Sequence, residues 1–230
     1  MGDEKRRLAA VAVELPEGVT PPGTAGRILH AGLQLFSEYG FHGASIRDIA
    51  VAAGINSATL YAHYPSKEHI LAALVRLGHE ELHGRLQRAL VSAGDGPGAT
   101  AATGATAQLA ALVRAHVTAH AEYPLLAVVA NSELHALSAE LAAPAVALRE
   151  QSTRLLLAVL HKGMETGEFA VDDAFLAAAA IAGMGLRVAH WFGPHQPYRR
   201  DEVADEFAAF ALRLVGVAAD KPATRRRSRR

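Results

Sequence analysis

One short segment of the chain has the spacing of a catalytic metal site. Residues 79–83, HEELH, match the H-E-x-x-H pattern, in which two imidazoles one helical turn apart bind zinc and the glutamate acts as general base. However, no third-ligand signature follows, and a chain with 12 histidines produces such pairs by chance. We therefore expect no metal, no cofactor and no enzyme, and keep a zinc hydrolase centred on His79, Glu80 and His83 as the alternative function.

The elements that would position these histidines are helices. Residues 79–83 lie in a long stretch, starting at Pro65-Ser66-Lys67-Glu68, whose leucines recur at helical spacing. His116 and His120, a second pair four residues apart, lie in another such stretch, and we expect a pocket or core role for them. Helices are expected near 103–121, 125–138, 142–166, 172–192 and 201–218, with a loop at 93–100. No strand pattern is evident, so the predicted fold class is all-α.

Composition limits the function. A chain of 230 residues with 50% apolar and 20% charged residues is globular and long enough for a head and a larger body. It has no cysteine, and acids and prolines interrupt its amino-terminal apolar stretch, so we expect a cytoplasmic protein without a signal peptide. The formal net charge is +0, so any contact with a polyanion must be local.

The amino-terminal part predicts an arm followed by a compact helical unit. Residues 1–23 are rich in proline and glycine, which favours a flexible arm. From Thr24, a possible N-cap, apolar residues follow a helical period until Gly40 ends it. We expect an amphipathic first helix over this range.

Residues 45–64 have the pattern of a helix-turn-helix. Ser45, followed three residues later by Asp48, resembles a capping box at the start of a short helix. Gly54 suits a sharp turn, because glycine takes positive φ without steric cost, and Asn56 or Ser57 can cap the next helix, about 57–63. Small Ala50 inside the first helix permits a close crossing, with Ile46, Ile55 and Leu60 packing between the two helices.

The segment from Gly54 to Glu68, GINSATLYAHYPSKE, resembles the end of the DNA-binding head in the TetR family of transcriptional regulators. The Leu60-Tyr61 pair, Tyr64 and the Ser66-Lys67-Glu68 helix start carry the resemblance. It implies that Leu60 and Tyr64 close the small core and that the residues facing DNA are Ser57, Ala58, Thr59, Tyr61, Ala62 and His63. It also implies that Lys67 meets a phosphate, and Arg47 can reach the flanking strand.

One position departs from the family pattern. Residue 57, often basic in the family, is serine here, so one contact with DNA is missing. Lys5, Arg6 and Arg7 in the arm can compensate by entering a minor groove, or remain solvated. The basic tail, residues 220–230, is either disordered in solvent or contacts phosphate without sequence preference.

The stretch 172–192 is apolar nearly all round, so a membrane span has to be weighed. Alanine and glycine dominate it, and Arg187 and His190 interrupt it, leaving fewer than the roughly 20 apolar residues that a bilayer needs. We expect a buried helix and no membrane. The resemblance implies a homodimer formed by this helix and the last one, whose apolar residues are Val203, Phe207, Phe210, Leu214 and Val217.

The segments 124–137 and 183–194 resemble the body of actinobacterial regulators of steroid and fatty-acid breakdown. This resemblance implies an acyl-CoA or steroid-CoA inducer in an apolar tunnel, with Arg149 near its phosphates. The residues expected to line the tunnel are Leu112, His116, Leu126, Val129 and Leu134. Each of them is also compatible with an ordinary core position.

The complete prediction is a ligand-responsive repressor that binds palindromic double-stranded operator DNA as a homodimer. Activation instead of repression stays open, since the same head can recruit as well as block. The expected units are the arm 1–23, a head 24–70, a ligand-binding and dimerisation body 71–219, and the tail 220–230. A long helix joins the three-helix head to the body.

Overall fold

The computed structural model describes residues 11–94 and 104–217, which contain nine α-helices, one 3-10 helix and no strand. The all-α class is therefore confirmed. The elements are α2 (Gly23–Gly43), α3 (Ile46–Ala52), α4 (Ser57–His63), α5 (Lys67–Gly94), α6 (Ala105–Glu122), α7 (Pro124–Ser132), η1 (Leu134–Ala136), α8 (Ala139–Glu165), α9 (Ala174–Trp191) and α10 (Arg200–Leu214).

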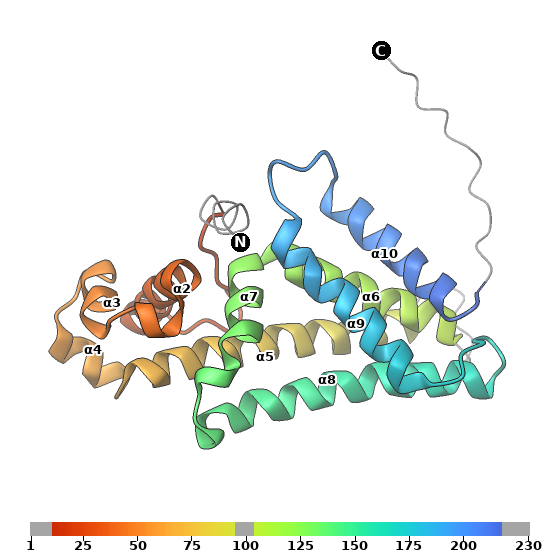
Figure 1. The fold of residues 1–230 in the computed structure, drawn as a ribbon, viewed down its shortest axis with the longest axis horizontal. Coiled ribbons are helices and arrows are strands. Elements are labelled where there is room, and N and C mark those ends of the chain that lie inside the picture. Colours follow the sequence, from red (N-terminus) through yellow and green to blue (C-terminus); the bar gives the residue numbers. More distant parts are fainter. Residues whose placement is uncertain (1–10, 95–103, 218–230) are drawn as a thin grey trace, which may run out of the picture.

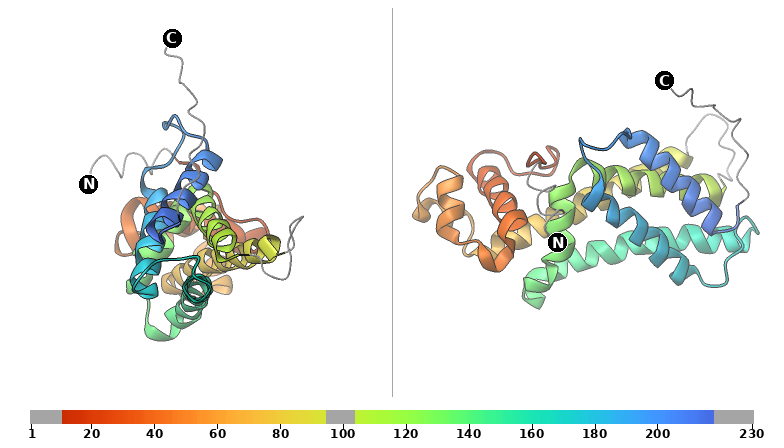
Figure 2. Two further views of the ribbon diagram at one scale, coloured as in Figure 1. Left: turned by 90° about the vertical axis from the view of Figure 1, so that its right-hand side faces the viewer. Right: turned by 45° about the horizontal axis from the view of Figure 1, so that its top comes forward.

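The helices form a head at one end and a larger bundle at the other (Figure 1). Helices α2, α3 and α4 make the head, and α5 runs from it into the bundle, where it packs against α6 and α8. Helices α9 and α10 pack against α6. Two further views show that α5 is the long connection between head and bundle (Figure 2). The expected boundary at residue 70 thus falls inside a continuous helix.

The apolar core has two parts, and one of them crosses from head to bundle. The head cluster contains Leu29, Phe36 and Leu60, each no more than 2% exposed, and it extends to Leu126 and Val129 of α7. The second cluster fills the bundle between α5, α6, α8, α9 and α10. Because α7 packs into the head cluster, the head is not an independent unit attached only through α5.

Two predicted helix ends differ from the structure. Thr24 does not cap the first helix: Pro22 occupies the N-cap position, and the Thr24 hydroxyl instead accepts from Arg27 at 3.3 Å. The helix expected over 125–138 ends at Ser132. There the side chains of Asn131 and Ser132 donate to carbonyls four residues back, at 2.8 and 2.7 Å, which is typical of bent or ending helices.

The described part of the expected arm, residues 11–22, is irregular and lies against the head. Val11, Val13 and Leu15 are partly buried on the head cluster, and the Val13 carbonyl lies 3.0 Å from His30 Nε2. The tail and residues 1–10, with Lys5, Arg6 and Arg7, lie outside the described residues.

Candidate nucleic-acid interface and internal cavity

Local hydrogen bonds build the two short helices of the head in the predicted way. The Ser45 hydroxyl accepts from the backbone of Asp48 at 3.1 Å and donates to its carboxylate at 2.5 Å, which caps α3. Gly54 has a φ of +66°, the left-handed conformation that favours glycine. Asn56 then caps α4 by accepting from the backbone of Thr59 at 2.8 Å. The turn between α3 and α4 is therefore short and sharp.

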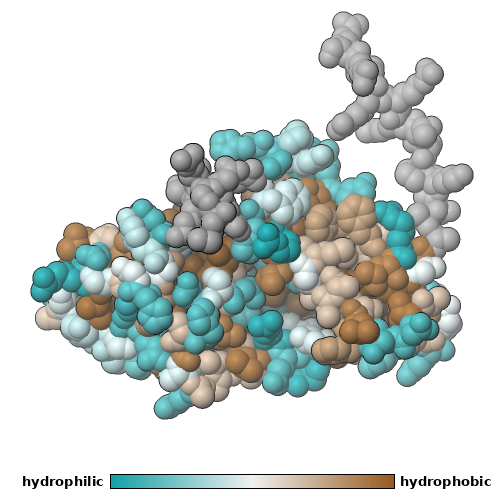
Figure 3. Space-filling model, viewed as in Figure 1, coloured by the Kyte–Doolittle hydropathy of each residue, from teal (hydrophilic) through white to brown (hydrophobic). Residues whose placement is uncertain are grey.

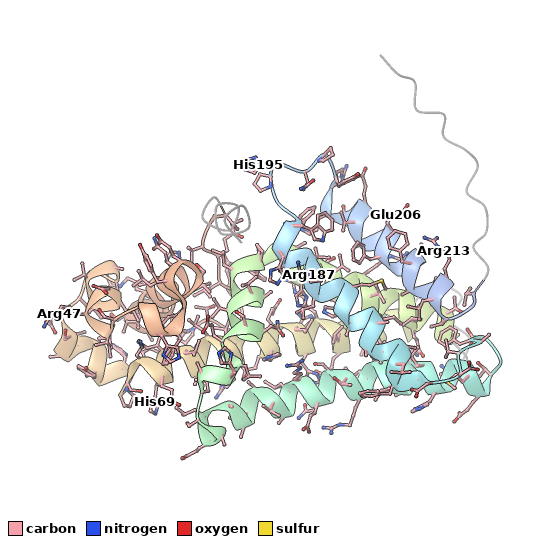
Figure 4. The ribbon with its side chains drawn as sticks, viewed as in Figure 1. Arg47, His69, Arg187, His195, Glu206 and Arg213 are labelled. Atoms are coloured by element: carbon pink, nitrogen blue, oxygen red, sulfur yellow. The ribbon has the colours of Figure 1, made fainter. Side chains whose placement is uncertain are left out.

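Helix α4 is anchored by one side and accessible on the other. Leu60 is 0% exposed and packs in the head cluster, whereas Tyr61 is 50% exposed. The remaining residues expected to face DNA are accessible, with Thr59 half-buried and Ser57, Ala58, Ala62 and His63 exposed. Arg47 of α3 is also exposed, at the end of the head farthest from the bundle (Figure 4). An exposed short helix of this kind can enter the major groove of DNA.

Lys67, expected to meet a phosphate, is engaged inside the head. Its Nζ donates to the carbonyl oxygens of Phe41 at 2.6 Å and Ala44 at 2.7 Å. The ammonium also lies 4.4 Å from the centre of the Phe41 ring. An ammonium has three N–H donors, so one remains for a phosphate. Lys67 thus ties the end of α2 to the start of α5, a role that the sequence pattern did not reveal.

A cavity of about 400 Å³ lies between α5, α6, α8 and α9, and Asn131 of α7 also contributes to its wall. Of the residues expected to line a ligand tunnel, Leu112, His116 and Arg149 lie on its wall. Leu126 lies on an adjoining cavity of about 30 Å³. Val129 is buried in the head cluster, and Leu134 packs against it. The structure therefore does not bring these six residues to one surface.

Sequence reasoning missed most of the cavity wall, because it depends on how distant helices pack. The wall also includes residues without any chemical signature in the sequence, namely Leu82, Leu86, Val113, Ser152, Leu156, Phe175, Ala178, Ile181 and Leu186. Gly185 has no side chain, which leaves room for the ring of His116. A Cβ at position 185 would lie 3.2 Å from that ring. A small residue in α9 is therefore needed where that ring packs.

Burial disfavours the charged form of the histidines at the cavity. Burial lowers the pKa of His79 to about 4, with the charge of Arg149 as the next cause. Burial also lowers the pKa of His116, whose ring centre lies 4.4 Å from that of His120. His79 is 5% exposed and lines the cavity, while its neighbour Glu80 pairs with Arg76 at 2.8 Å on the accessible side of α5. In the described ranges no three metal-binding side chains come together.

The outer side of α9 and α10 is apolar. Phe175 and Leu176 of α9 are 64% exposed, and Phe210 and Leu214 of α10 are 42% and 38% exposed. Figure 3 shows apolar side chains gathered over these helices. Among the described residues, α9 alone is long and apolar enough to cross a membrane, and 39% of that stretch is buried in the protein. The same helix contributes to the cavity wall and to the bundle core.

Two protein families match the sequence, one over each part of the fold. Residues 28–74 match "Bacterial regulatory proteins, tetR family", which covers α2 beyond its first turn, α3, α4 and the start of α5. Residues 102–215 match "Tetracyclin repressor-like, C-terminal domain", which covers the bundle from α6 to α10.

Individual proteins resemble the chain over most of its length. The transcriptional repressor KstR2 of Rhodococcus jostii is 28% identical over 84% of this chain and 96% of its own. The crystal structure of PfmR, a TetR family regulator of Thermus thermophilus, is 31% identical over 81% of this chain and 97% of its own, with a TM-score of 0.70. AibR, solved with isovaleryl coenzyme A and operator DNA, has the same fold, with 22% identity, 80% and 95% coverage and a TM-score of 0.67.

Proposed function

Because the chain belongs to the TetR family of bacterial transcriptional regulators, we propose that it represses transcription by binding a palindromic operator and leaves DNA when a small apolar ligand fills its cavity. Regulators of this family bind operator DNA and dimerise, and the similarity to KstR2 favours repression over activation. The matched families and relatives are regulators, which removes the zinc hydrolase as an alternative.

The observation that carries the DNA-binding role is the exposure of α4 beside its buried anchor Leu60. Thr59 and Tyr61 present hydroxyls that can donate to phosphate oxygens, and Ser57 and His63 add further polar groups to the same helix. Arg47, at the end of the head (Figure 4), would contact the flanking strand. Lys67 uses its third N–H donor on a phosphate while it holds the head together.

The apolar outer side of α9 and α10 is the proposed dimer face. A twofold dimer holds two α4 helices about one DNA turn, roughly 34 Å, apart, as a palindrome requires. Substituting Leu176→Glu together with Phe210→Glu should convert the dimer to a monomer in light scattering after gel filtration. The exposed pair Val51→Glu and Val91→Glu, outside this face, is the matched control. An unchanged dimer in the first variant contradicts this face.

The proposed ligand is an acyl-CoA or steroid-CoA ester. The cavity wall is mostly apolar, and exposed Arg149 at its edge supplies a positive charge for a phosphate. That a protein of the same fold was solved with isovaleryl coenzyme A supports this class. Leu126 and Val129 of α7 and Leu134 of η1 would then act behind the wall, by packing these two elements against the head.

Footprinting upstream of the chain's own gene tests DNA recognition. A protected palindrome, with affinity that falls steeply as salt rises, is expected. Retardation without sequence preference would contradict specific repression.

A panel of acyl-CoA and steroid-CoA esters added to the DNA complex tests the ligand. The inducer must bind the free protein and the DNA-bound protein with different affinity, so it should release the operator. Release by the free fatty acids alone, with no effect of the thioesters, would contradict the coenzyme A class.

A further inference from the structure

Helix α4 presents two alanines on the side that points away from the protein. An α-helix turns by about 100° per residue. Ala58 and Ala62 each lie two residues from Leu60, the buried anchor of α4, so their methyl groups lie about 160° round the helix from it. Both alanines are exposed. When α4 enters a major groove, these two methyl groups therefore face the base edges most directly.

The side chains of α4 that can hydrogen-bond lie on its flanks, about 80–120° from the midline between the two alanines. They belong to Ser57, Thr59, Tyr61 and His63. On the flanks of a helix in the major groove they are directed at the sugar-phosphate walls, whose contacts position a protein without reading sequence. The centre of the helix is left to the two methyl groups.

The residue types that read guanine and adenine by paired hydrogen bonds are not part of α4. Arginine and lysine pair with guanine in this way, and asparagine and glutamine pair with adenine. The sequence of α4, SATLYAH, contains none of these four types. The nearest is Asn56 at its start, whose Oδ1 accepts from the backbone of Thr59 at 2.8 Å and caps the helix. This bond holds the amide at the helix end instead of over the bases.

The chemistry that suits two exposed methyl groups is another methyl group. Thymine alone among the four bases presents one in the major groove, at C5. An alanine side chain makes van der Waals contact with it, whereas cytosine or uracil leaves a gap there. Ala58 and Ala62 lie four residues, about 6 Å, apart along α4, which corresponds to about two base pairs for a helix lying along the groove.

We infer that α4 reads thymines in each half-site of the operator, through contact of the Ala58 and Ala62 methyl groups with thymine 5-methyl groups. The inference rests on the proposed function, because it assumes that α4 enters the major groove of an operator. It specifies the base that the recognition helix selects, and it assigns the selection to side chains without a polar group.

Uracil scanning of a selected operator tests this inference. The probe is the duplex that the full-length protein enriches most strongly from random-sequence DNA, and fluorescence anisotropy at a fixed salt concentration measures its affinity. Each thymine, on either strand, is replaced by deoxyuridine in both half-sites at once, which removes only the methyl groups. At one or two positions the affinity should fall by about 10–20-fold, because a buried methyl group contributes about fourfold in each half-site.

Methylated cytosine is the converse probe. Replacing a sensitive T·A pair by C·G should also lower the affinity. 5-Methylcytosine at the same place should restore it to within about threefold of the original value, because it returns the methyl group to the groove. If 5-methylcytosine binds no better than cytosine, the thymine is recognised through its O4 or through DNA shape, and the inference is overturned.

Glycine variants assign the contact to residues. Ala58→Gly and Ala62→Gly should each make the affinities for the thymine and uracil duplexes equal, within about twofold, at one of the sensitive positions. The two duplexes are compared within one variant, so the general cost of glycine in a helix cancels. Ala52→Gly, at an exposed alanine in the last turn of α3, is the matched control and should keep the full preference for thymine.

The outcomes separate this inference from the proposed function. If the protein selects an operator whose half-sites lack thymine, or in which uracil is neutral at every thymine, the methyl contact is overturned and specific DNA binding stands. A preference for thymine that survives in both glycine variants overturns it as well. If no sequence is enriched from random DNA, specific DNA binding fails, and this inference fails with it.

Discussion

The carboxylate of Glu133 lies 3.4 Å from the backbone nitrogen of Phe41, which is 92 residues away in the sequence. Glu133 ends α7, and Phe41 follows the non-helical Gly40 near the end of α2. Asn131, two residues before Glu133, lines the cavity. The cavity wall and the DNA-binding head are therefore joined by less than one helical turn of α7.

Glu133→Ala should weaken the coupling between ligand and DNA. Loss of the carboxylate removes a contact between the end of α7 and the head, so the factor by which the inducer lowers operator affinity should fall, from a typical 5–150-fold toward 1. Affinity for the inducer alone should stay within about twofold. Operator titrations with and without the inducer measure this factor.

The matched control is Glu140→Ala, an exposed glutamate at the start of α8. Its coupling should equal that of the unsubstituted protein. If Glu133→Ala keeps the full coupling factor, the head is moved through other contacts, such as the 2.7 Å bond from the Ser138 backbone to Glu68.

Tyr61→Ala should reduce operator affinity by about tenfold or more without lowering the unfolding free energy measurably, because the side chain is half exposed and outside the core. Fluorescence anisotropy with labelled operator measures the affinity. Tyr198→Ala removes an equally exposed tyrosine near the start of α10 and should have no effect on DNA binding. Equal losses in both variants would mean that Tyr61 does not contact DNA.

Lys67→Met should lower the unfolding free energy by about 1.5–3 kcal/mol, the usual contribution of a charged hydrogen bond, because the Phe41 and Ala44 carbonyls lose their donor. Urea denaturation measures this loss. The slope of log affinity against log salt should also fall by about 0.9 if the third N–H contacts a phosphate. A loss of stability with an unchanged slope would restrict Lys67 to its structural role.

Glu168 should make folding stability depend on pH at the acid end. Its carboxylate accepts from the backbone nitrogens of Ala105 and Thr106, each at 2.9 Å, and these bonds lower its pKa from 4.5 to about 2. Because the pKa of Glu168 is lower in the folded protein than in the unfolded chain, the ionised carboxylate stabilises the fold. This stabilisation is complete above pH 4.5 and is lost as pH falls toward 2. Glu168→Gln should cost about 1 kcal/mol at pH 7, as does loss of a helix cap.

Denaturation at several pH values checks this prediction. The difference between Glu168→Gln and the unsubstituted protein should shrink between pH 4.5 and 2. Glu165→Gln, at an exposed position in the same turn region, should show no such pH dependence. If the difference in unfolding free energy between the two proteins stays constant with pH, the ionised Glu168 carboxylate does not stabilise the start of α6.

The elements of the fold were predictable because their signals are local. Capping by Ser45 and Asn56, the positive φ of Gly54 and the helical period of the bundle all depend on neighbouring residues, and the structure has them. The end of α7 was missed because the side chain of Ser132 bonds back to its own helix, an outcome that composition does not fix.

The cavity was less predictable, because its wall comes from five helices that meet only in the folded chain. Leu112, His116 and Arg149 were identified with it, whereas Val129 packs toward the head. His79 was noticed as part of a metal motif, whereas its place on a cavity wall exists only after α5, α6 and α7 have packed.

Because α5 is continuous from the head into the bundle, a small tilt of this helix moves the head by a larger distance. Lys67 lies 12 residues before His79, a length of about 18 Å along the axis. A tilt of about 5° about His79 would therefore displace the head end by roughly 1.6 Å. In a twofold dimer the partner swings in the opposite sense, so the two reading helices shift by about 3 Å against a fixed DNA repeat of roughly 34 Å. A change too small to disturb the packing of the bundle can thus put both half-sites out of register at once.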